Sequence, residues 1–168
     1  MEFGFEFWTF IVRWLHVASG IMWIGILWYL NFVQTPTMPK IPAELRPAIP
    51  GHIMPVTLWY FRWAALATVV FGLILAWMNG YLVDALALGL TDQVAKHASI
   101  GFGMWFGLIM AFNVWFIIWP NQQKVIGLVE ATDEEKPKAA RTAALASRTN
   151  TMLSIPMLYA MVGAQNLF

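Results

Sequence analysis

Long apolar runs separated by polar loops dominate the pattern of hydrophobic and polar positions along this chain. Three runs, at about 8–33, 58–77 and 98–119, reach the roughly 20 mostly apolar residues that a transmembrane helix needs. A fourth run, at about 149–168, is diluted by polar residues and a proline. The pattern predicts an all-α integral membrane protein, an antiparallel four-transmembrane-helix bundle that forms a single membrane domain over 1–168.

Two long connections lie between these runs. Six prolines between positions 36 and 55 predict that the first connection, 34–57, is extended and non-helical. Acids and lysines around Pro137 predict that the second, 120–148, is solvated, and the fourth helix spans well if it begins within that polar stretch. The short apolar segment 81–90 contains Asp84 and is too short to span, so it is expected at the membrane interface.

The composition also indicates a bilayer. Hydrophobic residues make up 60% of the 168 residues and charged residues only 11%, whereas soluble domains carry about 25% charged residues. A net charge of +1 gives no reason to expect nucleic acid as a partner. The N-terminus is acidic and aromatic, so the first run is expected to be a permanent helix and not a cleaved signal peptide.

Lysine and arginine are distributed unevenly between the two ends of the predicted bundle. Eight of the ten lie in or beside the connections 34–57 and 120–148, while only Arg13 and Lys96 lie at the opposite end. Cytoplasmic loops are enriched in these residues. We therefore expect both connections in the cytoplasm and both termini on the outer, periplasmic side of a bacterial inner (cytoplasmic) membrane.

Two similar strings contain two of the three histidines, namely HVASG beginning at His16 and HASIG beginning at His97. Both lie in the predicted outer half of the membrane, and spacing by three or four places Arg13, His16 and Gly20 on one helix face, as it does His97 and Gly101. Two imidazoles with glycines beside them suit the axial ligation of a haem between helices. The pattern predicts one non-covalent haem b, with His16 and His97 on the iron and Arg13 pairing with a propionate.

Simpler explanations also exist for these residues. Histidines near helix ends anchor at the interface, and glycines in membrane helices permit close packing. The pattern places no carboxylate or third histidine near the pair, which disfavours zinc, and His52 in the first connection is expected to be unliganded. Asn113 is predicted to form an interhelical hydrogen bond. The chain has no cysteine, which excludes disulfides, thiolate metal sites and c-type haem.

Four strings, in order along the chain, resemble the membrane domain of bacterial membrane-bound urate hydroxylases, the urate oxidase N-terminal domain family. They are RWLHVASGIMWIGILWYLNFVQTP (13–36), WYFRWAALATVVFGLIL (59–75), NVWFIIWPNQQKVIG (113–127) and SRTNTMLSIPMLYAM (147–161). The resemblance implies a link to urate oxidation, with electrons passing to the respiratory chain through cytochrome c. It also implies a C-terminal cytochrome c domain, but this sequence has no CxxCH motif and resembles a short form without it.

Together these observations predict a membrane-embedded b-type haem redox protein that passes electrons within or across the membrane. We expect a homo-oligomer or a subunit of a larger redox complex in the lipid bilayer, with cytochrome c or a quinone as candidate redox partners. One alternative is a urate hydroxylase that binds a purine among Trp and Asn or Arg side chains. Another is a non-catalytic structural subunit of a respiratory or photosynthetic complex.

Overall fold

The computed structural model describes residues 4–168, and all regular elements in that range are helical. The elements in chain order are α1 (Phe5–Trp28), η1 (Tyr29–Gln34), α2 (Thr35–Thr37), η2 (Met38–Lys40), η3 (Ile49–Ile53), α3 (Met54–Met78), α4 (Leu82–Leu86), α5 (Ala95–Phe112), η4 (Asn113–Ile118), α6 (Trp119–Val125) and α7 (Glu135–Asn166). The elements η1, η3 and η4 are π-helical, and η2 is a 3₁₀ turn.

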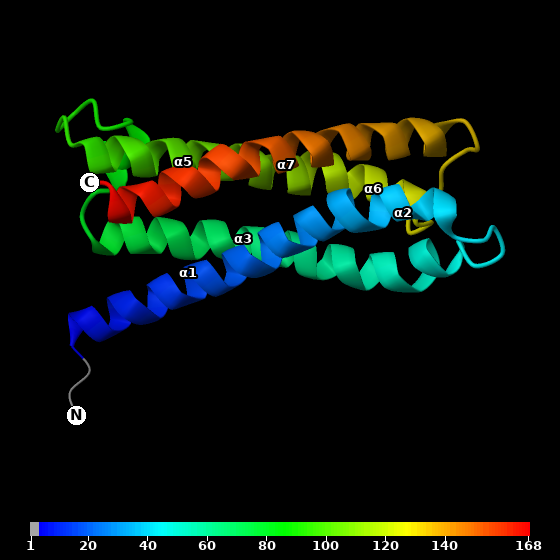
Figure 1. The fold of residues 1–168 in the computed structure, drawn as a ribbon, viewed down its shortest axis with the longest axis horizontal. Coiled ribbons are helices and arrows are strands. Elements are labelled where there is room, and N and C mark those ends of the chain that lie inside the picture. The colour runs from blue at the N-terminus through cyan, green and yellow to red at the C-terminus, as the bar shows by residue number, and fades with distance from the viewer. Residues whose placement is uncertain (1–3) are drawn as a thin grey trace.

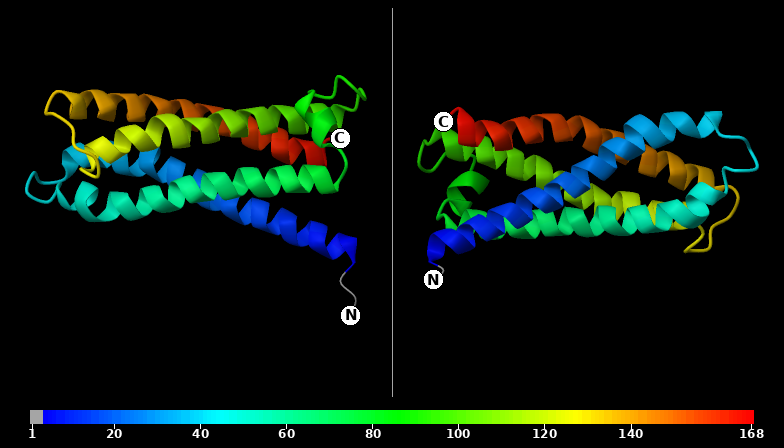
Figure 2. Two further views of the ribbon diagram at one scale, coloured as in Figure 1. Left: turned by 180° about the vertical axis from the view of Figure 1, so that it is seen from behind. Right: turned by 60° about the horizontal axis from the view of Figure 1, so that its bottom comes forward.

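Four long helical segments form an antiparallel bundle (Figure 1). Helix α1 packs along α3, and α5 packs along α7. Both termini lie at one end of the bundle, and the connections 41–48 and 126–134 lie at the other (Figure 1, Figure 2). Helix α1 diverges from the other helices toward its N-terminus in Figure 1 and in the left view of Figure 2.

Three helical segments are long and apolar enough to cross a membrane: Phe5–Lys40, Ile49–Met78 and Ala95–Val125. Many large apolar side chains on the outside of the bundle are exposed, including Trp14, Trp77 and Phe116. A soluble protein rarely exposes so much contiguous apolar surface. These features indicate an integral membrane protein.

The proline-rich connection differs from the extended loop expected over 34–57. Helical structure continues through Lys40 and resumes at Ile49, so the connection between the helices shrinks to 41–48. The prolines at positions 36, 39, 50 and 55 each lie in the first turn of a helical element. Only Pro50 lies in the first turn of a continuous helical segment, where the missing N–H breaks no hydrogen bond. Pro36 and Pro55 follow the π-helical elements η1 and η3 by two residues, where the regular α-helical hydrogen-bond pattern is already interrupted.

Helix α7 is less apolar than the other long helices, and three of its polar side chains, Asn150, Thr151 and Ser154, are buried in the bundle. Asn150 and Ser154 are fully buried. The amide of Asn113 donates to Asn150 Oδ1 (2.8 Å), Asn150 Nδ2 donates to the Met110 carbonyl (2.9 Å), and Trp28 Nε1 donates to Ser154 Oγ (2.9 Å). The predicted interhelical hydrogen bond of Asn113 is confirmed. The helix begins at Glu135 and has 32 residues, which at 1.5 Å per residue is about 48 Å.

Removing the buried amide on α7 should destabilise the bundle. Asn150→Ala removes the hydrogen bonds that its side chain makes to the Asn113 amide and the Met110 carbonyl, and we expect a loss of about 1–2 kcal/mol in the free energy of unfolding. Unfolding by sodium dodecyl sulfate in a mild detergent measures it. Asn166→Ala is the control, because Asn166 is exposed and its side-chain amide donates to the Val162 carbonyl within the same helix. Equal stability of the two variants would contradict the prediction.

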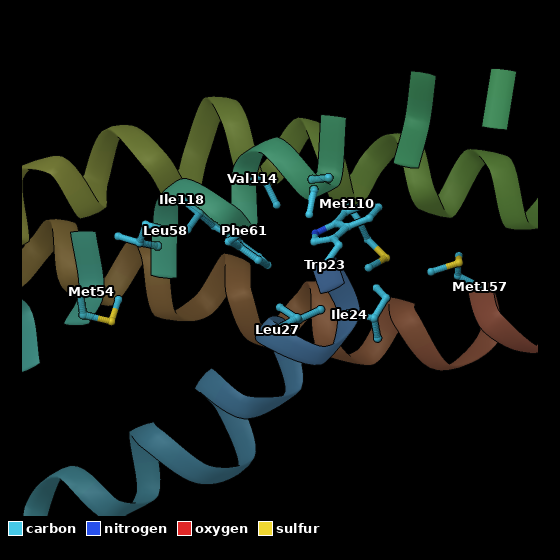
Figure 3. Close-up of a cluster of buried hydrophobic side chains, with 12 residues drawn as sticks. Trp23, Ile24, Leu27, Met54, Leu58, Phe61, Met110, Val114, Ile118 and Met157 are labelled. Atoms are coloured by element: carbon cyan, nitrogen blue, oxygen red, sulfur yellow. The ribbon is translucent and has the colours of Figure 1, made fainter. Parts of the chain in front are cut away.

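The apolar core occupies the middle of the bundle (Figure 3). Trp23 and Leu27 from α1 meet Phe61 from α3, Met110 from α5 and Val114 from η4, and all five are at most 1% exposed. Large interdigitating side chains hold the four segments together here. Between this core and the end that holds the termini, glycines replace large side chains on the facing helices.

The orientation of the bundle in the membrane is a prediction from the lysine and arginine asymmetry. Cysteines introduced as Leu45→Cys and Glu135→Cys should resist a membrane-impermeant thiol reagent in intact cells, because both positions lie at the predicted cytoplasmic end. Leu90→Cys is the control. Leu90 is exposed in the turn at the opposite end, so it should be labelled. Labelling of the first two positions and protection of the third would reverse the orientation.

Candidate functional site

A cavity of about 580 Å³ lies between α1, α3, α5 and α7, on the side of the core nearer the termini. Its walls are mostly apolar, and five glycines contribute to them: Gly20, Gly25, Gly72, Gly103 and Gly107. Cofactor and ligand sites commonly have volumes of about 300–1,000 Å³ with mostly apolar walls and a few polar groups. The cavity therefore has the size and lining of a small-molecule or cofactor site.

His16 is the imidazole in the cavity wall, and α3 fixes its orientation. Its Nδ1 lies 2.8 Å from the carbonyl oxygen of Thr68. A carbonyl only accepts, so Nδ1 carries the proton and Nε2 keeps a free lone pair. Gly72, one turn after Thr68 on α3, makes room for the ring, since a Cβ there would lie 2.8 Å from His16 Cε1. This arrangement leaves Nε2 as the nitrogen available to a metal or a hydrogen-bond donor.

The mouth of the cavity toward the termini is polar. Arg13, one turn before His16, lines it together with Tyr81, Gln165 and Asn166. Burial raises the pKa of the Tyr81 hydroxyl above its ordinary value, and the positive charge of Arg13 opposes part of that increase. The mouth therefore offers a cation and several hydrogen-bond donors to an anionic group on a bound molecule.

The structure brings together only three of the five predicted site residues. Arg13, His16 and Gly20 line the cavity, whereas His97 and Gly101 do not. A Cβ on Gly20 would meet only the Thr68 methyl group, at 3.7 Å, but a Cβ on Gly101 would lie 2.1 Å from the Ala85 carbonyl oxygen. Gly20 therefore borders the cavity, and Gly101 permits close packing of α5 against α4.

His97 lies beside the cavity lining and faces the 82–94 segment. Its Nδ1 hydrogen-bonds with the Asp92 carboxylate, and its ring stacks on that of Tyr81, with centroids 5.3 Å apart and an interplanar angle of 24°. His52, the third histidine, lies in η3 at the opposite end of the bundle and is exposed. The two similar strings HVASG and HASIG therefore place their histidines, His16 and His97, in different surroundings.

Several cavity residues were not predicted from the sequence. Thr68 and Gly72 lie four residues apart on α3, and Gly103 and Gly107 lie four apart on α5. Small residues at this spacing form a flat helix face that permits close approach, so the pattern would have indicated both walls. Tyr81 lies outside the long helices, and no spacing rule connects it to His16.

A second cluster, formed by one arginine and three tryptophans, surrounds Arg62 on α3. The Arg62 guanidinium is 3.8 Å from the centroid of the Trp119 ring and about 6 Å from those of Trp63 (6.0 Å) and Trp115 (5.9 Å). Such cation–π contacts stabilise a charge in apolar surroundings. None of the four residues lines the cavity, so this cluster is separate from it.

The cavity is open on its side, between α1 and α7. Ile21 on α1 and Val162 on α7 both line it, yet they are 70% and 60% exposed. Both side chains therefore border an opening that leads to the outside of the bundle.

Comparison with known proteins identifies a family. A family model described as urate oxidase N-terminal matches residues 73–166, more than half of the chain. No curated protein and no solved structure matches. The matched region includes the cavity walls formed by α5 and α7, whereas His16 and Thr68 lie outside it.

Proposed function

The chain belongs to the urate oxidase N-terminal family, and from this premise we propose that it is a membrane-embedded redox protein that holds one b-type haem in the cavity. The observation that carries the proposal is the free Nε2 of His16 at an apolar cavity. Nε2 has no hydrogen-bond partner among residues 4–168 and borders a mostly apolar cavity, so a metal ion at this position is a suitable partner.

The residues around the cavity fit such a group. The bond from Nδ1 to the Thr68 carbonyl would fix the ring plane of the iron ligand, as carbonyl and carboxylate partners commonly do for metal-bound histidines. A Cβ on Gly25 or Gly107 would meet no atom within 4 Å, so these walls leave room for a flat ring. Arg13 at the mouth would pair with a propionate. Without cysteine, attachment would be non-covalent.

A second ligand to the iron would come from the walls formed by α5 and α7. His97, the ligand expected from the sequence, does not line the cavity, but Met104, Met157 and Met161 do. Thioether sulfur is a known axial partner of histidine in cytochromes and raises the reduction potential. When bound, the haem would supply an iron that takes up and releases one electron at a time.

The visible spectrum of the protein tests the proposal. Protein purified in mild detergent from cells that make haem should show a Soret band and, after reduction by dithionite, sharp α and β bands. The pyridine haemochrome should identify haem b. A protein that stays colourless after incubation with haem would contradict the proposal and favour a structural subunit.

The family match also supports urate as the electron donor of this centre. Under anaerobic conditions, urate added to the oxidised protein should then produce the reduced spectrum, and urate should be consumed. A haem protein that dithionite reduces but urate does not would retain the redox function and exclude urate as its direct donor.

A further inference from the structure

Three side chains that can ligate a metal converge at the end of the bundle that holds the termini. Asp84 lies on α4, Asp92 in the turn that follows, and His97 in the first turn of α5. One ligand atom from each lies within 4.8 Å of the others. We propose that Asp84, Asp92 and His97 bind one divalent transition-metal cation, for which Zn²⁺ is the probe. The site is distinct from the cavity and does not depend on the haem.

The donor set favours a transition metal over magnesium or calcium. Two carboxylate oxygens and one imidazole nitrogen form a three-ligand set that water completes, as in open zinc sites. Magnesium and calcium prefer oxygen ligands alone, whereas imidazole suits zinc and its neighbours. The cluster therefore has both the number and the type of ligands that a divalent transition metal requires.

The charges in the cluster point to a cation independently of its geometry. Asp84 has no ion pair among residues 4–168, and the one basic partner of Asp92 is His97. Two neighbouring carboxylates repel each other, and His97 is the one basic side chain paired with either of them among residues 4–168. A bound divalent cation would neutralise both carboxylates.

Tight backbone packing holds the three ligands in place before any metal binds. A Cβ on Gly101 would lie 2.1 Å from the Ala85 carbonyl oxygen, and one on Gly89 would lie 2.9 Å from the Ala98 amide nitrogen. Helix α4 and the following turn therefore lie directly against α5. Since little reorganisation is needed, binding costs little conformational entropy.

Calorimetric titration of the full chain with Zn²⁺ tests the site. The protein is purified in mild detergent and stripped of metal with a chelator. One equivalent of Zn²⁺ should bind. Asp84→Asn, Asp92→Asn and His97→Gln should each weaken the affinity by at least about tenfold, because even the loss of a residue that hydrogen-bonds to a metal ligand has an effect of that size. Mg²⁺ should bind far more weakly than Zn²⁺. His52→Gln and Glu44→Gln, at the opposite end, should bind Zn²⁺ as the unmodified chain does.

The variants distinguish Zn²⁺ binding at this cluster from Zn²⁺ binding elsewhere on the protein. Circular dichroism and gel filtration establish that each variant is folded, and the asparagine variants keep the side-chain volume of aspartate. Loss of Zn²⁺ binding in His52→Gln but not in the cluster variants would overturn the proposal, as would the absence of a one-equivalent transition in the unmodified chain. His16→Ala should leave Zn²⁺ affinity unchanged, so failure of the haem proposal is recognised separately.

Discussion

His16→Ala should abolish the haem spectrum of the purified protein. The substitution removes the imidazole at the cavity and leaves the thioethers, which bind haem iron weakly on their own. We expect the Soret absorbance per mole of protein to fall by at least about tenfold. Removing a residue that only hydrogen-bonds to a metal ligand typically lowers metal affinity 10–100-fold, and removing the ligand itself should lower it more. Added imidazole should restore part of the band, because the cavity of the variant has room for it.

Two other histidines serve as controls for this result. His52→Ala should keep the spectrum, because His52 lies at the far end of the bundle. His97→Ala should keep it as well, since His97 does not line the cavity. Loss of the spectrum in a folded His97→Ala protein would restore the hypothesis of paired imidazoles, and an unaltered spectrum in His16→Ala would remove the haem from this cavity.

Gly101→Ala should cost about 3 kcal/mol or more in the free energy of unfolding. The new Cβ would lie 2.1 Å from a backbone carbonyl oxygen of α4, and a helix backbone cannot yield as a flexible side chain does. Overpacking in cores costs typically 1–3 kcal/mol and sometimes more. Unfolding in mixed detergent micelles measures the loss, and the Zn²⁺ affinity of the displaced Asp84 should fall with it.

Gly107→Ala is the matched control on the same helix. Its Cβ would meet no atom within 4 Å, and alanine favours helix over glycine by about 1 kcal/mol. Stability should therefore be unchanged or slightly higher. Equal destabilisation by the two substitutions would show that close packing of α4 on α5 is not what Gly101 provides.

Local spacing predicted which candidate residues share a helix face, and three of the five line the cavity. Arg13, His16 and Gly20 lie three and four residues apart on a single helix, so their shared face follows from helix geometry alone. The same rule places His97 and Gly101 on one face of α5. It cannot say what covers that face, which depends on how residues 82–94 fold back over the helix.

The path of α4 and its turn explains the incorrect expectation about carboxylates. The sequence predicts the segment 81–90 at the interface and places no carboxylate near His97. In the structure this segment and the turn after it lie against α5 and bring Asp84 and Asp92 to His97. Contacts of this kind depend on how α4 and the turn pack against α5. The order of hydrophobic and polar residues along the chain does not predict that packing.

Helix α7 shows a related limit of hydropathy as a guide. Its polar residues dilute the apolar run, yet Asn150 and Ser154 point into the bundle, where they bond to Asn113 and Trp28. Membrane helices use such residues between helices rather than toward lipid. The asparagine on η4 was predicted to have an interhelical partner, but its identity required the structure.

The opening beside Ile21 and Val162 determines whether a ligand enters the cavity from the lipid bilayer or from water. In a bilayer, acyl chains and not water lie along that flank, so an apolar molecule arrives by lateral diffusion within a leaflet. Each buried methylene group favours transfer from water to lipid by about 0.8 kcal/mol. An apolar ligand is therefore concentrated in the bilayer before it binds the protein. Occupancy then follows the ratio of ligand to lipid, and excess detergent micelles deplete the cavity by dilution.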